Sequence, residues 1–131
     1  MPVVDIMNLK PSDLARAALQ AYVDKDRDSI EALLGKDYHF TSPLDNRLDR
    51  ATYFRRCWPN SASMAGFECI HSVDSGGRVF VVYEATTEAG KRFRNTEMHV
   101  VRDGRIIATE VYFGWDVPHK ARPGGYIEDH D

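Results

Sequence analysis

A two-residue Asp103-Gly104 turn between two long alternating runs is the feature that most constrains the fold of this chain. Asp-Gly in this setting is the strongest short-range signal for a β-hairpin, because both residues accept positive φ angles. The sequence therefore predicts paired strands over residues 91–102 and 105–115.

Alternation assigns the side chains of this hairpin to faces of the sheet. The apolar face of the second strand holds Ile107, Thr109, Val111, Phe113 and Trp115. On the first strand, Met98 and Val100 share a face with Arg94 and Thr96, and Glu97 and His99 point the opposite way. A polar set on adjacent strands results: Glu97, His99, Glu110 and Tyr112. A carboxylate beside a histidine suits acid–base chemistry, but the apolar partner face favours an outward, interfacial or solvated position for this set.

The remaining sequence predicts helices first and strands afterwards. Pro11-Ser12-Asp13 begins a helix that runs to about Asp24, and a short second helix follows Asp28, whose spacing to Glu31 suits a capping box. A third helix is expected from about Asp49 to Pro59. Strands are expected over 38–42, 66–74, 78–87, 91–102 and 105–115. This order predicts an α+β fold, a strongly curved antiparallel sheet packed against three helices of the N-terminal half.

Length and charge narrow the classes of function. The chain has 131 residues and a net charge of −3, from 17 basic and 20 acidic residues, so we expect one domain and no nucleic-acid partner. No apolar run suits a membrane span and no signal peptide is recognised, so a cytoplasmic protein is expected. Cys57 and Cys69 lack metal or redox spacing and are expected to be free thiols. No nucleotide or metal motif is present, and neither His39 nor His71 has a ligand-like neighbour, so no cofactor or metal is expected.

The order of elements, together with AYVDKDRDSIEALLGKDYHFTSPL and HVVRDGRIIATEVYFGWD, resembles the nuclear transport factor two-like superfamily. More narrowly it resembles the SnoaL-like and ketosteroid-isomerase-like branch, over about residues 12–116, with 117–131 as a tail. The resemblance implies a cone-shaped pocket between helices and sheet, and a homodimer formed through the outer sheet face. That face would carry Glu97, His99, Glu110 and Tyr112. Members of the superfamily range from isomerases, dehydratases and cyclases to pure binding modules, so the fold alone selects none of them.

The resemblance also implies which isomerase residues are lost. The Asp-Pro that carries the base of ketosteroid isomerases corresponds to Ser42-Pro43, and the two residues that stabilise the oxyanion correspond to Ala18 and Met98. None of the three side chains supplies the required proton transfer or hydrogen bond. Steroid isomerisation by that mechanism is therefore not expected.

The resemblance still implies a mostly apolar pocket that carries several hydroxyl groups. Such a wall suits a small apolar or aromatic molecule, and Tyr22 and Tyr83 are candidate catalytic residues that could hold a water or polarise a carbonyl. The same two tyrosines can equally be ordinary core residues. Arg55, Arg56 and Arg94 are candidate contacts at the rim. The expected ligand-binding set is Tyr22, Ser42, Trp58, Val81, Tyr83, Arg94, Met98, Val100, Thr109, Val111 and Phe113. We therefore expect a cofactor-free cyclase, dehydratase or isomerase, or else a non-catalytic dimeric binding or interaction module.

Overall fold

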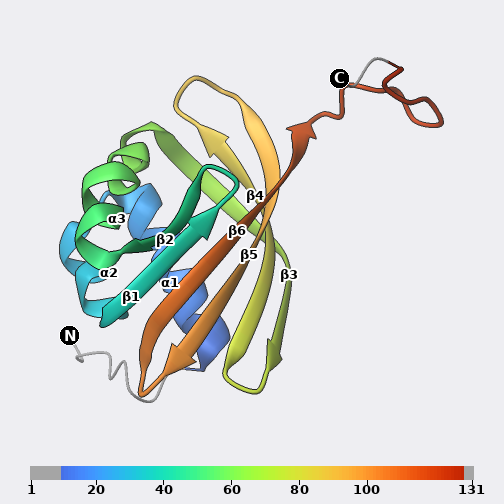
Figure 1. Cartoon of the computed structure of the whole chain (residues 1–131). Helices are drawn as coiled ribbons and strands as arrows, with labels where there is room; N and C mark the ends of the chain where they lie inside the picture. The colour runs from blue at the N-terminus through green and yellow to red at the C-terminus, as the bar shows by residue number, and fades with distance from the viewer. Residues whose placement is uncertain (1–9, 129–131) are drawn as a thin grey trace, which may run out of the picture.

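The computed structural model describes residues 10–128 and places three α-helices and a 3-10 helix beside one sheet (Figure 1). Each α-helix begins at a residue suited to that position. Pro11 begins α1, and the carboxylates of Asp26 and Asp49 accept the Ser29 and Thr52 amides at the starts of α2 and α3. Asp26 therefore caps the second helix, and the capping box predicted at Asp28 is wrong. The helices are α1 (Pro11–Asp24), α2 (Arg27–Leu33), α3 (Arg50–Arg56) and η2 (Trp58–Ser63).

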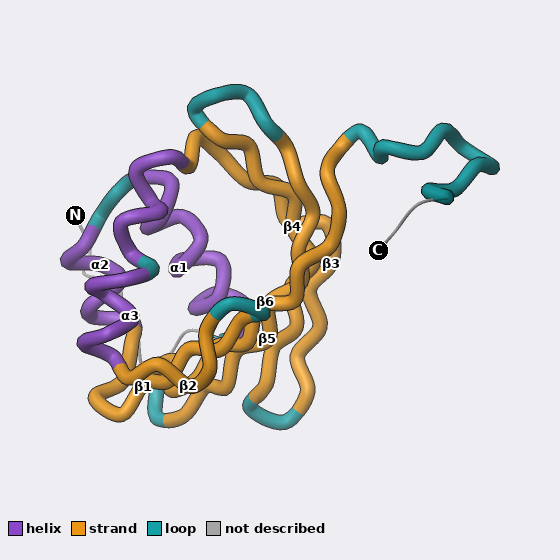
Figure 2. Tube along the Cα trace, turned by 45° about the horizontal axis from the view of Figure 1, so that its top comes forward, coloured by secondary structure: helices purple, strands orange, loops and turns teal. Residues whose placement is uncertain are grey.

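The sheet has six strands in the order β2-β1-β6-β5-β4-β3 and curves around the helices (Figure 2). The α+β class and the helix-covered sheet are as predicted. The prediction of a wholly antiparallel sheet is wrong, because β1 pairs in parallel with β6. The strand bounds are β1 (Leu34–Ser42), β2 (Asp45–Asp49), β3 (Met64–Ser75), β4 (Arg78–Thr87), β5 (Arg92–Arg102) and β6 (Arg105–Val117). β2 was not predicted, since its five residues, DNRLD, carry no alternating apolar pattern.

The predicted hairpin is confirmed, with positive φ at both Asp103 and Gly104. An uninterrupted ladder from this turn would pair Met98 with Thr109. The structure instead pairs Val101 with Ile106 and Val100 with Ala108, which leaves an extra residue on β6 between them. This β-bulge shifts the pairing by one residue, and a one-residue shift exchanges the two faces of a strand. As a result His99 lies opposite Thr109 and Glu97 opposite Val111, so both point to the inner, helix-covered face.

Two groups of buried side chains hold the helices on the sheet. One lies between α1, α2, α3 and β1 and includes Leu14, Ile30, Tyr38 and Ile106. The other lies between Ala15 and Leu19 of α1 and four inner residues of β4: Val79, Val81, Tyr83 and Ala85. The space between these two groups is the place where a cavity can form. No helix within residues 10–128 is long and apolar enough to cross a membrane.

Beyond β6 the chain leaves the body of the molecule. Residues 118–128 form neither helix nor strand and project away from the sheet (Figure 1); the last three residues of the predicted tail lie outside the described part. Cys57 and Cys69 are free thiols, as expected.

Candidate active site

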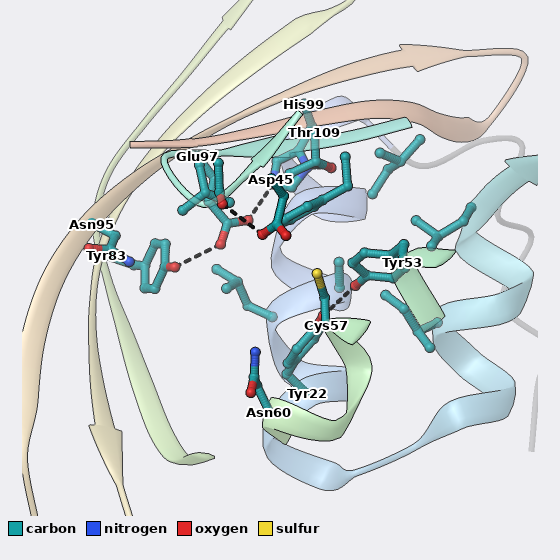
Figure 3. Close-up of a pocket in the computed structure, with 18 of the residues that line it drawn as sticks. Tyr22, Asp45, Tyr53, Cys57, Asn60, Tyr83, Asn95, Glu97, His99 and Thr109 are labelled. Carbon is teal, nitrogen blue, oxygen red and sulfur yellow. Dashed lines mark hydrogen bonds and ion pairs between the residues drawn. The ribbon is translucent and has the colours of Figure 1, made fainter. Parts of the chain in front are cut away.

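A cavity of about 210 Å³ lies between the helices and the inner face of the sheet (Figure 3). Its lining is mostly apolar, and it is smaller than the roughly 300–1,000 Å³ of pockets for drug-sized ligands. A molecule of one or two rings fits such a space. The polar side chains that line the cavity form three groups, which we call the sheet wall, the helix wall and the mouth.

Glu97 is the centre of the sheet wall (Figure 3). Its Oε2 accepts the hydroxyl proton of Tyr83 at 2.7 Å, and its Oε1 lies 3.1 Å from Nε2 of His99. That second contact has the distance of an ion pair without the alignment of a hydrogen bond. On its other side, Nδ1 of His99 is 2.8 Å from Oγ1 of Thr109. The Glu97 side chain is 15% exposed and that of His99 only 3%, so the carboxylate is the group within reach of a ligand.

The helix wall carries a pair of tyrosines. The hydroxyls of Tyr22 on α1 and Tyr53 on α3 are hydrogen-bonded to each other across the two helices. The ring of Trp58 packs edge-on against Tyr22, with centroids 4.9 Å apart, and Tyr38 packs in the same way against Tyr53 at 5.1 Å. These ring contacts fix the two phenols, which are presented to the cavity from the wall opposite Glu97 (Figure 3).

An ion pair closes one side of the mouth. Arg56 donates to Asp45, and the hydroxyl of Ser42 donates to the other carboxylate oxygen at 2.9 Å. The hydrogen bond from Arg56 is the main cause that lowers the pKa of Asp45. The Arg56 side chain is 57% exposed, whereas that of Asp45 is 9% exposed. Both oxygens of the ionised Asp45 carboxylate therefore accept hydrogen bonds, and the group is not free to act as a base.

Burial keeps the tyrosines of the cavity protonated. Desolvation is the main cause that raises the pKa of each, and the charge of Glu97 raises all four further; they are Tyr22, Tyr38, Tyr53 and Tyr83. The influence of Glu97 on phenols of both walls shows that its charge acts across the cavity. Burial also raises the pKa of the Cys57 thiol to about 11, so it is not a thiolate near neutral pH. The cavity thus offers phenol donors on two sides of one carboxylate.

The structure brings only part of the predicted ligand set to the cavity. Six of its members line the space: Tyr22, Ser42, Tyr83, Thr109, Val111 and Phe113. The other five do not. Trp58 stands behind Tyr22, and Val81 is buried in the core against α1. Arg94, Met98 and Val100 lie on the outer face, where Arg94 donates to Glu84. The one-residue shift at the bulge of β6 is the reason that Met98 and Val100 were assigned to the wrong face.

The same shift divides the polar set that was expected on the outer face. Glu97 and His99 point into the cavity, while Glu110 and Tyr112 stay outside, where the Tyr112 hydroxyl donates to Glu110. The comparison that put Met98 at an oxyanion-binding position of the isomerases is therefore wrong for this strand. Ala18 does line the cavity, and Tyr22 presents a phenol one helical turn further on. The cavity therefore contains acidic and phenolic groups, although the comparison with the isomerases indicated none.

Several lining residues were not anticipated: Tyr38, Tyr53, Cys57, Asn60 and Asn95, besides Glu97 and His99. Nothing in the sequence around Tyr53 indicates that its hydroxyl meets that of Tyr22. Within residues 10–128 no group of three or more His, Cys, Asp or Glu side chains is arranged to hold a metal ion.

Comparison with known proteins agrees with this architecture. The family model of the SnoaL-like domain matches residues 15–109, and no curated protein sequence matches the chain significantly. A proposed ketosteroid isomerase from Kribbella flavida DSM 17836 superposes with a TM-score of 0.68 at 17% identity, over 92% of this chain and 90% of that one. IdmH from Streptomyces antibioticus, a proposed polyketide cyclase, superposes with a TM-score of 0.63 at 21% identity, over 79% of this chain and 91% of that one. An LEH-like epoxide hydrolase of M. tuberculosis superposes with a TM-score of 0.65 at 18% identity, over 79% of this chain and 82% of that one. At these identities the structures share the fold.

Proposed function

The chain belongs to the SnoaL-like domain family, and from this we propose that it binds a small, uncharged carbonyl compound of one or two rings in the cone and moves a proton on it without an external cofactor. The observation that carries the proposal is the Glu97 carboxylate, placed in an apolar cavity and faced by the phenols of Tyr22, Tyr53 and Tyr83. Related folds described as polyketide cyclase and ketosteroid isomerase are consistent with such a ligand.

Glu97 is the group in the cavity that is best suited to act as a general base. Asp45 is held by Arg56 and Ser42, and the pKa of Asp45 is lowered accordingly. The Cys57 thiol is protonated, and Nε2 of His99 is buried behind the carboxylate. Of the two carboxylates that line the cavity, Glu97 is the more exposed, at 15% against 9% for Asp45, and Asp45 is paired with Arg56. A base must lie within hydrogen-bond reach of the proton that it takes, which the cavity allows for Glu97.

The Tyr22–Tyr53 pair is suited to hold the carbonyl oxygen of the ligand. Both phenols stay protonated because burial raises the pKa of each. In the proposed step Glu97 takes a proton from the carbon next to the carbonyl, and the electron pair moves onto oxygen as an enolate. The phenol proton that is not used between Tyr22 and Tyr53 stabilises this enolate. Return of the proton from Glu97 to another carbon gives isomerisation. Attack of the enolate carbon on a second carbonyl, whose oxygen takes that proton, gives cyclisation. Departure of a β-hydroxyl with that proton as water gives dehydration.

The charge of the lining defines the class of ligand. Among the described residues that line the cavity, the carboxylates are Asp45 and Glu97, and none is a lysine or arginine. We expect 2-acetonaphthone, which is neutral, to bind at least about tenfold more tightly than 2-naphthoate, because the anion meets a like charge in a poorly solvated space. Isothermal titration calorimetry of both compounds measures the difference in affinity, and this difference should be smaller for the Glu97→Gln variant. Equal or tighter binding of the anion would refute the uncharged class.

We also propose that two copies associate through the outer face of β4, β5 and β6. Phe80 and Tyr112 are 42% and 53% exposed on this face, and cross-strand pairing sets Phe80, Met98 and Glu110 in one row. Exposed aromatic groups on a sheet face commonly mark an interface. Sedimentation velocity should show a dimer for the native chain and a shift towards monomer for Glu110→Lys. A native monomer at micromolar concentration would contradict this assembly.

A further inference from the structure

A line of buried side chains stands behind Glu97 and is not itself part of the proton transfer described above. It consists of Thr109 on β6 and His99 on β5, which are 4% and 2% exposed. Nδ1 of His99 is 2.8 Å from Oγ1 of Thr109, and the other ring nitrogen of His99 lies 3.1 Å from Oε1 of Glu97. Groups this deeply buried need a partner for each polar atom.

The positions of the protons in this line follow from what lies on each side of the His99 ring. The hydroxyl of Thr109 can donate its proton to Nδ1 of His99, 2.8 Å away. A neutral imidazole that accepts at Nδ1 carries its own proton on Nε2. That nitrogen is 3.1 Å from the Glu97 carboxylate, so its N–H dipole is attracted to the charge although the pair lacks the alignment of a hydrogen bond.

The opposite tautomer leaves an unfavourable contact. If His99 donated through Nδ1 to Thr109, the lone pair of Nε2 would lie 3.1 Å from a carboxylate oxygen. Two acceptors in contact without a proton between them repel each other, and the repulsion is strong where water is excluded. The Nε2–H tautomer removes this repulsion.

We propose that Thr109 is a positioning residue that holds His99 as the neutral Nε2–H tautomer, so that one oxygen of Glu97 lies beside the N–H of His99 and the other accepts from Tyr83. The consequence for chemistry rests on the proposed role of Glu97 as the base. The Tyr83 hydrogen bond at Oε2 and the N–H of His99 beside Oε1 then hold the carboxylate at the cavity wall (Figure 3). Thr109 thereby acts on catalysis through His99 and does not touch the ligand's reacting atoms.

The test reads the tautomer directly and needs no ligand. Two-bond proton–nitrogen correlation spectra of the full chain, labelled with ¹⁵N-histidine, are recorded at about pH 9, where an ordinary imidazole is neutral. A His99→Gln variant assigns the His99 signals. We expect a protonated, pyrrole-type Nε2 and a pyridine-type Nδ1, with the Nδ1 signal moving in Thr109→Val and returning in Thr109→Ser. A protonated Nδ1 in the native protein, or a Nδ1 signal that Thr109→Val leaves unchanged, overturns the proposal.

A second readout links the tautomer to proton transfer. Using exchange of the α-protons of 2-tetralone in D₂O, we expect Thr109→Val to lower kcat about five- to tenfold, the effect of one hydrogen bond, with KM unchanged and with rescue by Thr109→Ser. No change in kcat would overturn the positioning role. If 2-tetralone exchanges no faster with protein than in buffer, the proposed function fails while the tautomer result still decides this inference. If Thr109→Val does not fold, the spectrum of the native chain decides it.

Discussion

Replacing Glu97 by glutamine is expected to lower the protein-catalysed exchange of the α-protons of 2-tetralone by about 10²–10⁴-fold, the usual contribution of a general base. The amide has nearly the shape of the carboxylate and can still accept from Tyr83, so the fold should persist while the proton acceptor is lost. Proton NMR in D₂O follows the loss of the α-proton signal. The ketone is neutral, has two rings and presents an acidic C–H beside its carbonyl, as the proposed ligand class requires.

Glu110→Gln is the matched control for this variant. Glu110 lies on the next strand but on the outer face, where it accepts from Tyr112. Its replacement makes the same chemical change and should leave the exchange rate unchanged. A Glu97→Gln protein that binds 2-tetralone and exchanges it at the native rate would exclude Glu97 as the base.

Gly114→Ala is expected to destabilise the fold by about 3 kcal/mol, at the upper end of the range for overpacking. A Cβ built on Gly114 lies only 2.1 Å from the carbonyl oxygen of Arg94 on β5. The residue is the second bulge of β6, since Arg94 pairs with Trp115 and Asn95 with Phe113. Its amide also donates to Oδ1 of Asn95 at 3.1 Å, and both Asn95 and Phe113 line the cavity. Urea unfolding measures the loss, with weaker binding of 2-tetralone as a secondary effect.

Gly66→Ala supplies the comparison for that variant. Gly66 lies on β3, and a Cβ there has nothing within 4 Å. Its change in stability should stay within about 0.5 kcal/mol, as for ordinary surface substitutions. If the two alanine variants have equal unfolding midpoints, then the close packing of β5 against Gly114 does not limit stability.

The parts of the fold that could be predicted are those with local signals. Asp103-Gly104 requires two positive φ angles and forms the turn, and Pro11 begins the first helix. The bulge of β6 could not be predicted in the same way, because no glycine or polar break marks residues 106–108. Its position depends on how the hairpin packs on β1 and the helices. Yet this single extra residue decides which face Glu97 and His99 occupy.

The residues that line the cavity were predicted better than the groups that would carry the chemistry. Tyr22, Tyr83 and Thr109 were expected in the cavity from the family resemblance and line it. Glu97 was recognised as half of an acid–base pair but was assigned to the outside, through the register. Tyr53 was not expected in the site, because its hydrogen bond to Tyr22 joins residues 31 positions apart. Contacts of that kind arise from tertiary packing, which alternation and capping signals do not encode.

A crystal structure of the protein soaked with 2-tetralone tests the central claim most directly, because it locates both reacting groups of the ligand at once. The account predicts the ketone inside the cone, with its oxygen within hydrogen-bond distance of the Tyr22 and Tyr53 hydroxyls and its C1 carbon facing the Glu97 carboxylate. A cone without the ketone, or a ketone whose C1 carbon points away from Glu97, would contradict it.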